Sequence, residues 1–227
     1  MNKIRKLDEL NLTLKNRDSF EVVQIAMNEI FKNKSAYVCS FGTESSVLLH
    51  MISNINNNFP IIFINTSKLF KETLVYKDKL KKKFNLKNLI EVFPSDLVIQ
   101  KYDQDSELWK KNPDFCCNIR KVLPLKDALK NFDAWFSGRK SFHSQTRKKK
   151  NIVELENNKY VISPLLNWSQ REINTYFSKN NLQKHPLFSK GYLSIGCKPC
   201  TSKSENNEIR SGRWKGNCKT ECGIHNN

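Results

Sequence analysis

The sequence predicts an α/β fold built on a mostly parallel sheet. Short runs of β-branched and aromatic residues alternate with segments whose apolar residues recur every three or four positions, the pattern of alternating strands and helices. The strand runs are apolar without alternation, as expected where helices cover both faces of a parallel sheet. At 227 residues the chain is long enough to bury a sizeable core. We therefore expect one domain over residues 1–227, with residues 201–227 as a mobile tail.

The first half of the chain contains three predicted strands. Asp18 can cap a first helix, and Glu21 stands three residues later, as in a capping box. The predicted strands are residues 36–40, 60–65 and 89–93, and the helices that follow them start near residues 47, 69 and 95. This alternation predicts parallel pairing of the strands.

The second half predicts a further strand, a hairpin and a helix. Residues 102–118 lack periodicity, and the helical pattern that resumes at Ile119 should kink or restart at Pro124, which has no backbone N–H. A fourth strand is predicted over residues 132–137. A hairpin over residues 153–155 and 160–162 should turn at Asn157-Asn158, and Asn167 is expected to cap the next helix. The charge run at residues 147–151 predicts a mobile loop.

A small polar loop follows the first strand and contains Ser40, Gly42, Thr43, Glu44 and Ser45. In α/β domains such a loop can bind a phosphate through free backbone N–H groups at the start of the next helix. One glycine is far fewer than a P-loop has, so an ordinary strand–helix turn with Ser and Thr caps is an equally good interpretation. The fourth predicted strand delivers Arg139 to the same edge of the sheet.

The chain is strongly basic, with 39 Lys and Arg against 22 Asp and Glu and a formal net charge of +17. This charge fits a nucleic-acid surface or a pocket for a small anion, but it also fits lysines spread over solvated faces by coding bias. The charge order matches no nucleic-acid motif. Because no signal peptide and no apolar run of about 20 residues is visible, we expect a cytoplasmic protein without a membrane span.

Seven cysteines argue against a complete disulfide framework and for metal or redox chemistry in a reducing compartment. Cys116-Cys117 and the Cys197-x-x-Cys200 motif could together supply four ligands to one site. Zinc is one interpretation. Adjacent cysteines are awkward around a single tetrahedral ion, whereas they can ligate different irons of a cluster, so the spacing favours iron–sulfur.

The last residues contain a separate candidate nucleophile. Cys222 lies in a short polar segment, where a reactive thiol has access, and His225 could act as its accessory partner or be merely solvated. Arg210 and Arg213, three residues apart, could clamp an anion from one side of a helical turn.

The chain as a whole resembles the assimilatory adenylyl-sulfate (APS) reductases, the iron–sulfur branch of the APS/PAPS reductase family. The resemblance rests on motifs in the family's order: Ser40-Phe41-Gly42-Thr43-Glu44-Ser45, Thr66-Ser67-Lys68-Leu69-Phe70, Cys116-Cys117-Asn118-Ile119-Arg120-Lys121, Trp135-Phe136-Ser137-Gly138-Arg139-Lys140, residues 191–201, Arg210-Ser211-Gly212-Arg213-Trp214 and Lys219-Thr220-Glu221-Cys222-Gly223-Ile224-His225. It implies a Rossmann-like sheet of the adenine-nucleotide α-hydrolase type.

The resemblance also implies roles for individual residues. Cys116, Cys117, Cys197 and Cys200 match the ligands of a [4Fe-4S] cluster, and Cys222 matches the nucleophile that forms an S-sulfocysteine intermediate. Reduced thioredoxin, or a glutaredoxin-like reductant, would then release sulfite. Lys121, Arg210 and Arg213 match residues facing the phosphosulfate, and the loop with Ser40, Gly42, Thr43, Glu44 and Ser45, together with Arg139, matches the substrate-binding edge.

Three further interpretations stay open at this point. The substrate could be PAPS, or both APS and PAPS; more remotely, the charge alone would suit a zinc-stabilised nucleic-acid-binding protein. The reductase interpretation predicts sulfate assimilation and cysteine biosynthesis as the setting, no nucleic-acid partner, and leaves room for a homo-oligomer. Cys218 is expected to be a bystander and Cys39 a buried core thiol.

Overall fold

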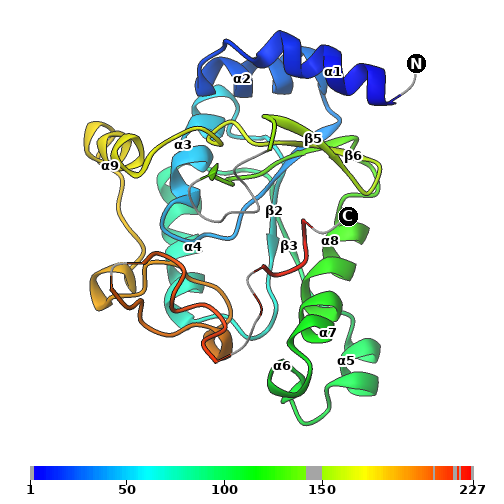
Figure 1. Cartoon of the computed structure of the whole chain (residues 1–227), viewed down its shortest axis with the longest axis vertical. Helices are drawn as coiled ribbons and strands as arrows, with labels where there is room; N and C mark the ends of the chain where they lie inside the picture. The colour runs from blue at the N-terminus through cyan, green and yellow to red at the C-terminus, as the bar shows by residue number, and fades with distance from the viewer. Residues whose placement is uncertain (1–2, 142–149, 207, 217–218, 220, 226–227) are drawn as a thin grey trace.

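A computed structural model of the chain describes residues 3–141, 150–206, 208–216, 219 and 221–225. Its centre is a six-stranded sheet in the order β3-β2-β1-β4-β6-β5 (Figure 1). The strands are β1 (Ser35–Val38), β2 (Ile61–Ile64), β3 (Leu89–Val92), β4 (Ala134–Phe136), β5 (Val153–Glu156) and β6 (Lys159–Ile162). Every pairing is parallel except that of β5 with β6. The predicted α/β fold with a mostly parallel sheet is confirmed.

Helices cover both faces of this sheet. They are α1 (Lys3–Leu14), α2 (Ser19–Ile25), α3 (Ser45–Ile55), α4 (Lys71–Lys83), α5 (Asp96–Tyr102), α6 (Leu108–Lys111), α7 (Pro113–Cys117), α8 (Leu123–Ala128) and α9 (Gln170–Lys179), with π-helical turns η1 (Ala26–Ile30) and η2 (Asn118–Val122) and 3-10 turns η5 (Phe188–Lys190) and η6 (Lys198–Cys200). Figure 1 shows α3 and α4 on one side of the central strands and α7 and α8 on the other.

Alternate side chains of the central strands enter two separate cores. On β4, Phe136 packs into a large cluster with residues of α2 and α3, whereas Trp135 faces a smaller cluster that contains Leu125 and Leu129. Both faces are therefore apolar, because successive side chains of a strand point to opposite faces of the sheet. This explains why the strand runs in the sequence are continuous and not alternating.

The chain order creates a switch point between β1 and β4. The chain passes from β1 outward through β2 and β3, and then returns to place β4 on the other side of β1. Loops that leave neighbouring strands in opposite directions open a crevice at the carboxyl ends of the strands, where ligands bind in open α/β sheets. The loops after β1 and β4 are the segments that carry Ser40 and Arg139.

Most local signals predict the observed elements. Asp18 accepts from the Glu21 N–H at 2.8 Å and the Glu21 carboxylate accepts from the Asp18 N–H at 3.0 Å, which completes the predicted capping box. Asn157 and Asn158 both have positive φ, as a tight hairpin turn requires. At Pro124 the predicted restart is not seen: the π-helical turn η2 passes into α8 with Val122 and Leu123 both in the right-handed helical region, and the proline stands in the first turn of α8.

The predicted cap of α9 is wrong. The N-cap is Ser169, not Asn167, and it forms a capping box with Glu172, whose carboxylate accepts from the Ser169 N–H at 2.7 Å. Asn167 and Ser169 are both possible caps. Ser169 has Glu172 three residues later, so their side chains satisfy each other's backbone N–H groups. The interval 102–118 holds α6 and α7, which are too short to show a period. Residues 147–149 of the predicted mobile loop lie outside the described residues.

One buried ion pair ties the helical region around α7 to the sheet. Arg120 and Asp103 have side chains only 4% and 0% exposed, and the Arg120 Nε lies 2.9 Å from the Asp103 carboxylate. Arg120 also donates to the Thr66 carbonyl at 2.9 Å, while Asp103 accepts from the Leu108 N–H at 2.8 Å. The pair therefore joins three segments.

We expect Asp103→Ala to lower the free energy of unfolding by about 3–5 kcal/mol, because it leaves the Arg120 guanidinium buried without its counterion. Urea denaturation of the holoprotein measures this loss. The matched control is Asp127→Ala, which breaks an exposed pair with Lys130 and should cost less than about 1 kcal/mol. Equal losses in the two variants would contradict the prediction.

Candidate active site

A cavity of about 260 Å³ opens at the switch point, above the ends of β1 and β4. Its lining includes every residue that the sequence assigns to substrate binding, the predicted nucleophile and its predicted partner: Ser40, Gly42, Thr43, Glu44, Ser45, Lys121, Arg139, Arg210, Arg213, Cys222 and His225. These residues come from segments as far apart as the first strand and the end of the chain. The sheet edge and the C-terminal segment thus enclose one site.

The loop after β1 forms the floor of the cavity. The Cys39 N–H still donates to the Ile62 carbonyl of β2, and then Phe41 takes a positive φ of 50°. Such a backbone is unfavourable for a bulky residue, and here the fully buried Phe41 ring is held edge-on against Phe63 at 5.2 Å. The turn brings the Ser40 and Ser45 hydroxyls within 2.9 Å of each other at the start of α3.

Several buried polar atoms face this cavity without a partner. Thr43 Oγ1, Arg213 Nε and Trp214 Nε1 have no hydrogen-bond partner in the part of the chain that the structure describes, and all three residues line the cavity. Buried polar groups in folded proteins are nearly always satisfied, so a cluster of exceptions marks a place where a polar ligand completes the bonding.

The C-terminal segment lies across the cavity. Glu221 pairs with Arg210 at 3.4 Å, Lys219 pairs with Asp114 of α7, and Ile224 packs against the smaller core cluster. His225 stacks on the Trp135 ring, with centroids 4.9 Å apart and an interplanar angle of 15°. The segment that carries Cys222 is therefore held on both sides of the thiol.

The cationic side chains of the cavity differ in how far they are neutralised. Arg139 pairs with Glu154 at 2.8 Å and Glu156 at 2.7 Å, and Lys140 pairs with Glu44 at 2.5 Å. Arg210 has Glu221. Lys121 and Arg213, by contrast, have no carboxylate partner among the residues the structure describes. These two are the cations best placed to bind an anionic ligand.

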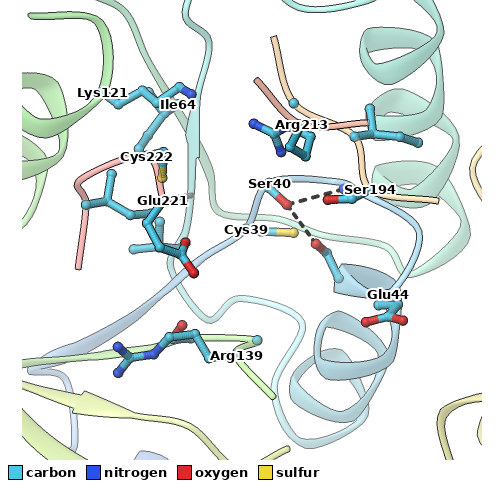
Figure 2. Close-up of a pocket in the computed structure, with 18 of the residues that line it drawn as sticks. Cys39, Ser40, Glu44, Ile64, Lys121, Arg139, Ser194, Arg213, Glu221 and Cys222 are labelled. Atoms are coloured by element: carbon cyan, nitrogen blue, oxygen red, sulfur yellow. Dashed lines mark hydrogen bonds between the residues drawn. The ribbon is translucent and has the colours of Figure 1, made fainter. Parts of the chain in front are cut away.

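Lys121 lies among thiols. Its Nζ is 3.9 Å from the Cys117 sulfur, and Figure 2 shows it beside Cys222 at one side of the cavity. Burial disfavours the charged ammonium, but the nearby thiolates of Cys197, Cys222 and Cys117 outweigh this and raise the pKa of Lys121. Lys121 is therefore a partly buried cation placed beside the predicted nucleophile.

Arg213 faces the site from the other side (Figure 2). Its guanidinium covers the Trp214 ring at 4.3 Å and lies directly over Gly196, where a Cβ would come within 2.6 Å of the Arg213 Cζ. A side chain at position 196 would therefore displace the Arg213 guanidinium. Arg213 and Arg210 are joined by a turn, with the Arg213 N–H donating to the Arg210 carbonyl at 2.9 Å.

The two cysteine pairs meet next to the cavity. Cys116 and Cys117 lie on α7, and the segment with Cys197 is held against the loop after β2, where Lys198 N–H donates to the Lys68 carbonyl at 2.7 Å. Burial, and then the charges of Cys117 and Cys197, raise the pKa of Cys116 to about 12. The charges of Cys197 and Cys117 also raise the pKa of Cys200, after burial. Cys116 and Cys200 are thus each within electrostatic reach of Cys117 and Cys197.

The donor set fits an iron–sulfur cluster in its chemistry. Cys116, Cys117 and Cys197 are buried and Cys200 is partly buried; all four are free thiols, the soft ligands that clusters use. Thr66 Oγ1 lies 3.2 Å from the Cys197 sulfur, and this bond together with Lys121 and Arg213 lowers the pKa of Cys197 despite burial. No group of three or more His, Cys, Asp or Glu in the described ranges has the geometry of a site for one metal ion.

Comparison with known proteins identifies the family. Residues 34–203 match the phosphoadenosine phosphosulfate reductase domain, which is most of the chain. The chain belongs to the phosphoadenosine phosphosulfate reductase family. Relatives named adenosine 5′-phosphosulfate reductase include a Mesorhizobium japonicum protein, 42% identical over 90% of this chain and 81% of its own length, and a Bacillus cereus protein, 38% identical over 86% and 85%.

Solved structures agree with the family. A phosphoadenylyl-sulfate reductase from Candida auris in a phosphate complex superposes with a TM-score of 0.74 and 28% identity, covering 86% of this chain and 96% of that one. An NAD synthetase from Campylobacter jejuni, with a TM-score of 0.51 and 17% identity over 82% of this chain and 77% of that one, shares the fold alone. The expected resemblance, the adenine-nucleotide α-hydrolase type of sheet and a sulfur-group oxidoreductase are confirmed.

One sequence-based interpretation of a single residue changes within this reductase family site. His225 is not merely solvated: its Nδ1 lies 3.0 Å from Glu156 and its Nε2 lies 3.3 Å from the Ser137 hydroxyl. With both ring nitrogens engaged, a positioning role is better supported than a Cys222–His225 dyad. Cys39 is buried, as expected, and also lines the cavity. Cys218 lies outside the described residues.

Sequence reasoning missed the residues through which the reductase holds its C-terminal segment. Trp135, Ser137 and Glu156 contact His225, yet in the sequence they are ordinary strand and strand-end residues. Only the pairing of Ala134–Phe136 with Tyr160–Ile162, and of β6 with β5, brings Glu156 near the end of β4. Across the described residues, no helix combines the length and apolar character needed to cross a membrane.

Proposed function

We propose that the chain reduces adenylyl sulfate (adenosine 5′-phosphosulfate) to sulfite and AMP through a covalent intermediate on Cys222. One observation carries the proposal: Cys222 lines a cavity in which Lys121 and Arg213 are the cations without carboxylate partners among the described residues. A thiol that shares a cavity with two available cations suits a substrate whose phosphate and sulfate are both anionic. The names of the relatives agree with this substrate.

In the first step the Cys222 thiolate attacks the sulfur of the phosphosulfate. A sulfur–sulfur bond forms, the bond between that sulfur and the bridging oxygen breaks, and AMP leaves with the electron pair on its phosphate oxygen. Lys121 and Arg213 would stabilise the charge that develops on the leaving phosphate and on the sulfonate. The Thr43 hydroxyl, just before α3, has no hydrogen-bond partner among the described residues and offers a further donor to the nucleotide's phosphate.

In the second step a thiol of reduced thioredoxin, or of a glutaredoxin-like protein, attacks the Cys222 sulfur. Sulfite leaves with the electron pair of the broken sulfur–sulfur bond, and the reductant's second thiol resolves the mixed disulfide, so two thiols are oxidised while the substrate sulfur gains two electrons. The C-terminal segment must then leave the cavity to meet its partner, which is why we retain residues 201–227 as a mobile tail of a single domain.

Cys116, Cys117, Cys197 and Cys200 are the residues that would hold a [4Fe-4S] cluster. When bound, the cluster would join α7 to the segment after η5 and add a charged centre next to Lys121. The steps above need only the thiol and the cations of this chain. Free thiols throughout the described residues also suit a reducing compartment, and we place the enzyme in the cytoplasm, in sulfate assimilation and cysteine biosynthesis.

The similarity to a phosphoadenylyl-sulfate reductase keeps PAPS as the second candidate substrate. The relatives and solved structures described above all act on nucleotides by name, which favours an enzyme over a zinc-stabilised nucleic-acid-binding protein. A steady-state comparison of APS and PAPS at equal concentrations decides between the substrates, and a preference for PAPS would overturn the proposal for APS.

The two-step scheme predicts that the enzyme, given APS without reductant, releases about one AMP per active site and then stops. Intact-mass analysis should show one added sulfo group, and peptide mapping should place it on Cys222. Reduced thioredoxin added afterwards should release sulfite. Were AMP release to require thioredoxin, direct transfer of the sulfo group to the reductant would fit better.

Within the same experiment, Arg213→Ala should slow AMP release about 100-fold, because one donor to the developing charge is lost. It should leave sulfite release from the preformed intermediate largely unchanged.

A further inference from the structure

Glu156 connects a buried ion pair to the end of the chain. Its side chain is 4% exposed; one carboxylate oxygen accepts from Arg139 at 2.7 Å and the other lies 3.0 Å from His225 Nδ1. Glu156 does not itself line the cavity, but both of its partners, Arg139 and His225, do. An effect of Glu156 on the reaction would pass through one of these two side chains, and His225 lies three residues after Cys222.

His225 is held from three directions. The Glu156 carboxylate lies beside Nδ1, the Ser137 hydroxyl lies 3.3 Å from Nε2, and the ring is stacked on Trp135. Ile224 adds an apolar contact to the same core cluster as Trp135. A solvated histidine would lack such contacts. Together, these contacts form a docking site for the last residues described.

We propose that Glu156 is a positioning residue: it holds His225 stacked on Trp135 and so keeps the segment that carries Cys222 closed over the cavity for attack on the substrate. The catalytic part of this statement rests on the proposed function, whereas the closing of the segment does not. The chemistry of the contact supports it, since a carboxylate fixed by a buried arginine offers a rigid, pre-oriented acceptor for the histidine ring.

The electrostatics of Glu156 agree with a fixed, ionised carboxylate. Burial alone would raise its pKa, but the hydrogen bond and charge of His225 and then the charge of Arg139 outweigh burial and hold the pKa of Glu156 below its usual value. The groups facing it are Arg139 from the β4 end, His225 from the C-terminal segment and Lys150, whose Nζ lies 3.9 Å away.

The contact is one that can open. Its partners lie on separate segments, and releasing His225 leaves Glu156 still paired with Arg139, so no buried carboxylate is stranded. A closed state that opens at small cost serves a thiol that must act first inside the cavity and then on a protein partner. The proposal therefore predicts that AMP release requires the closed segment, whereas sulfite release requires the open one.

The chain provides a matched control for this role. Glu154, two residues before Glu156 on β5, pairs with the same guanidinium at 2.8 Å and with Lys150 at 2.9 Å, with no contact to His225 among the interactions the structure describes. Glu156→Ala and Glu154→Ala each remove one carboxylate from Arg139. Only the first removes the acceptor for His225.

The test is the rate at which iodoacetamide alkylates Cys222 in the holoenzyme, followed by peptide mass spectrometry. We expect Glu156→Ala to raise this rate about tenfold, the effect of losing one charged hydrogen bond that holds a closed state. Glu154→Ala should stay within about twofold of the wild type. In single turnovers, Glu156→Ala should slow AMP release by a similar factor without slowing sulfite release from preformed intermediate. Equal alkylation rates in the two alanine variants would overturn the proposal.

A second variant covers the case in which Glu156→Ala does not fold. His225→Phe keeps an aromatic ring for the Trp135 stack and leaves the Arg139 pairs intact, but it cannot bond Glu156. It should raise the alkylation rate as Glu156→Ala does, and combining the two should add nothing further, since both act on one contact. An alkylation rate unchanged in His225→Phe, or fully additive effects, would show that Glu156 does not act through His225. The alkylation measurements stay interpretable even if the enzyme releases no AMP from APS.

Discussion

Replacing Cys222 with serine should lower AMP release from APS by at least about 1,000-fold. The hydroxyl that replaces the thiol is scarcely ionised near neutral pH, and Lys121 cannot lower its pKa enough to supply an oxyanion. Binding of the substrate between Lys121 and Arg213 should survive, because the cavity keeps its other lining residues. The loss should therefore fall on the rate of the first step and not on affinity.

Single-turnover AMP release measures this loss, and the visible spectrum of the same preparation tests the ligand set. If Cys222 is the nucleophile and not a ligand, the variant keeps the colour of the holoenzyme. Cys218→Ser, in the same segment, is the control and should retain most activity. A colourless Cys222→Ser protein, or an equal loss in Cys218→Ser, would mean that the wrong thiol has been assigned.

Replacing Cys117 with serine should remove most of the bound iron and most of the activity. Cys117 lies buried on α7 next to Cys116, so the proposed cluster would lose one of its four ligands and the connection between α7 and the segment of Cys197 and Cys200 would weaken. Its thiolate also contributes to the charge around Lys121, whose position beside Cys222 should then change. We expect iron and acid-labile sulfide to fall together.

Metal analysis of anaerobically purified protein makes the measurement. Cys39→Ser is a suitable control for iron content, because Cys39 is also a buried free thiol but lies on the first strand's end, away from both cysteine pairs in sequence. It should retain the iron of the wild type. Full iron content in Cys117→Ser would remove this residue from the ligand set, and bound zinc in a colourless wild-type protein would replace the cluster altogether.

The net charge of +17 turns out to be a poor guide to the site. Arg139, Lys140 and Arg210 all line the cavity, yet each has a carboxylate partner that offsets its charge. The cavity is cationic because of Lys121, which lies beside Cys222, and Arg213, which faces the cavity from the other side. The carboxylate partners of the other cations hold loops in position. Glu156, for example, pairs with Arg139 and also contacts His225 in the C-terminal segment.

The sequence by itself was sufficient for features decided over a few residues. The capping box of Asp18 and Glu21 and the turn at Asn157-Asn158 depend on local hydrogen bonds and backbone sterics, and both were predicted correctly. The spacing of apolar residues is also a local property, and it predicted the order of strands and helices. The ordered set of motifs was enough to predict the family, which the matched domain and relatives confirm.

Tertiary structure decided everything that depends on distant segments meeting. Whether Arg139 is available to a ligand depends on Glu154 and Glu156 of β5, and whether His225 is solvated depends on Trp135 of β4. The burial of a charged side chain and its choice of partner are properties of the folded sheet. The order of the strands in the sheet, and not the distance along the sequence, determines which charges become neighbours.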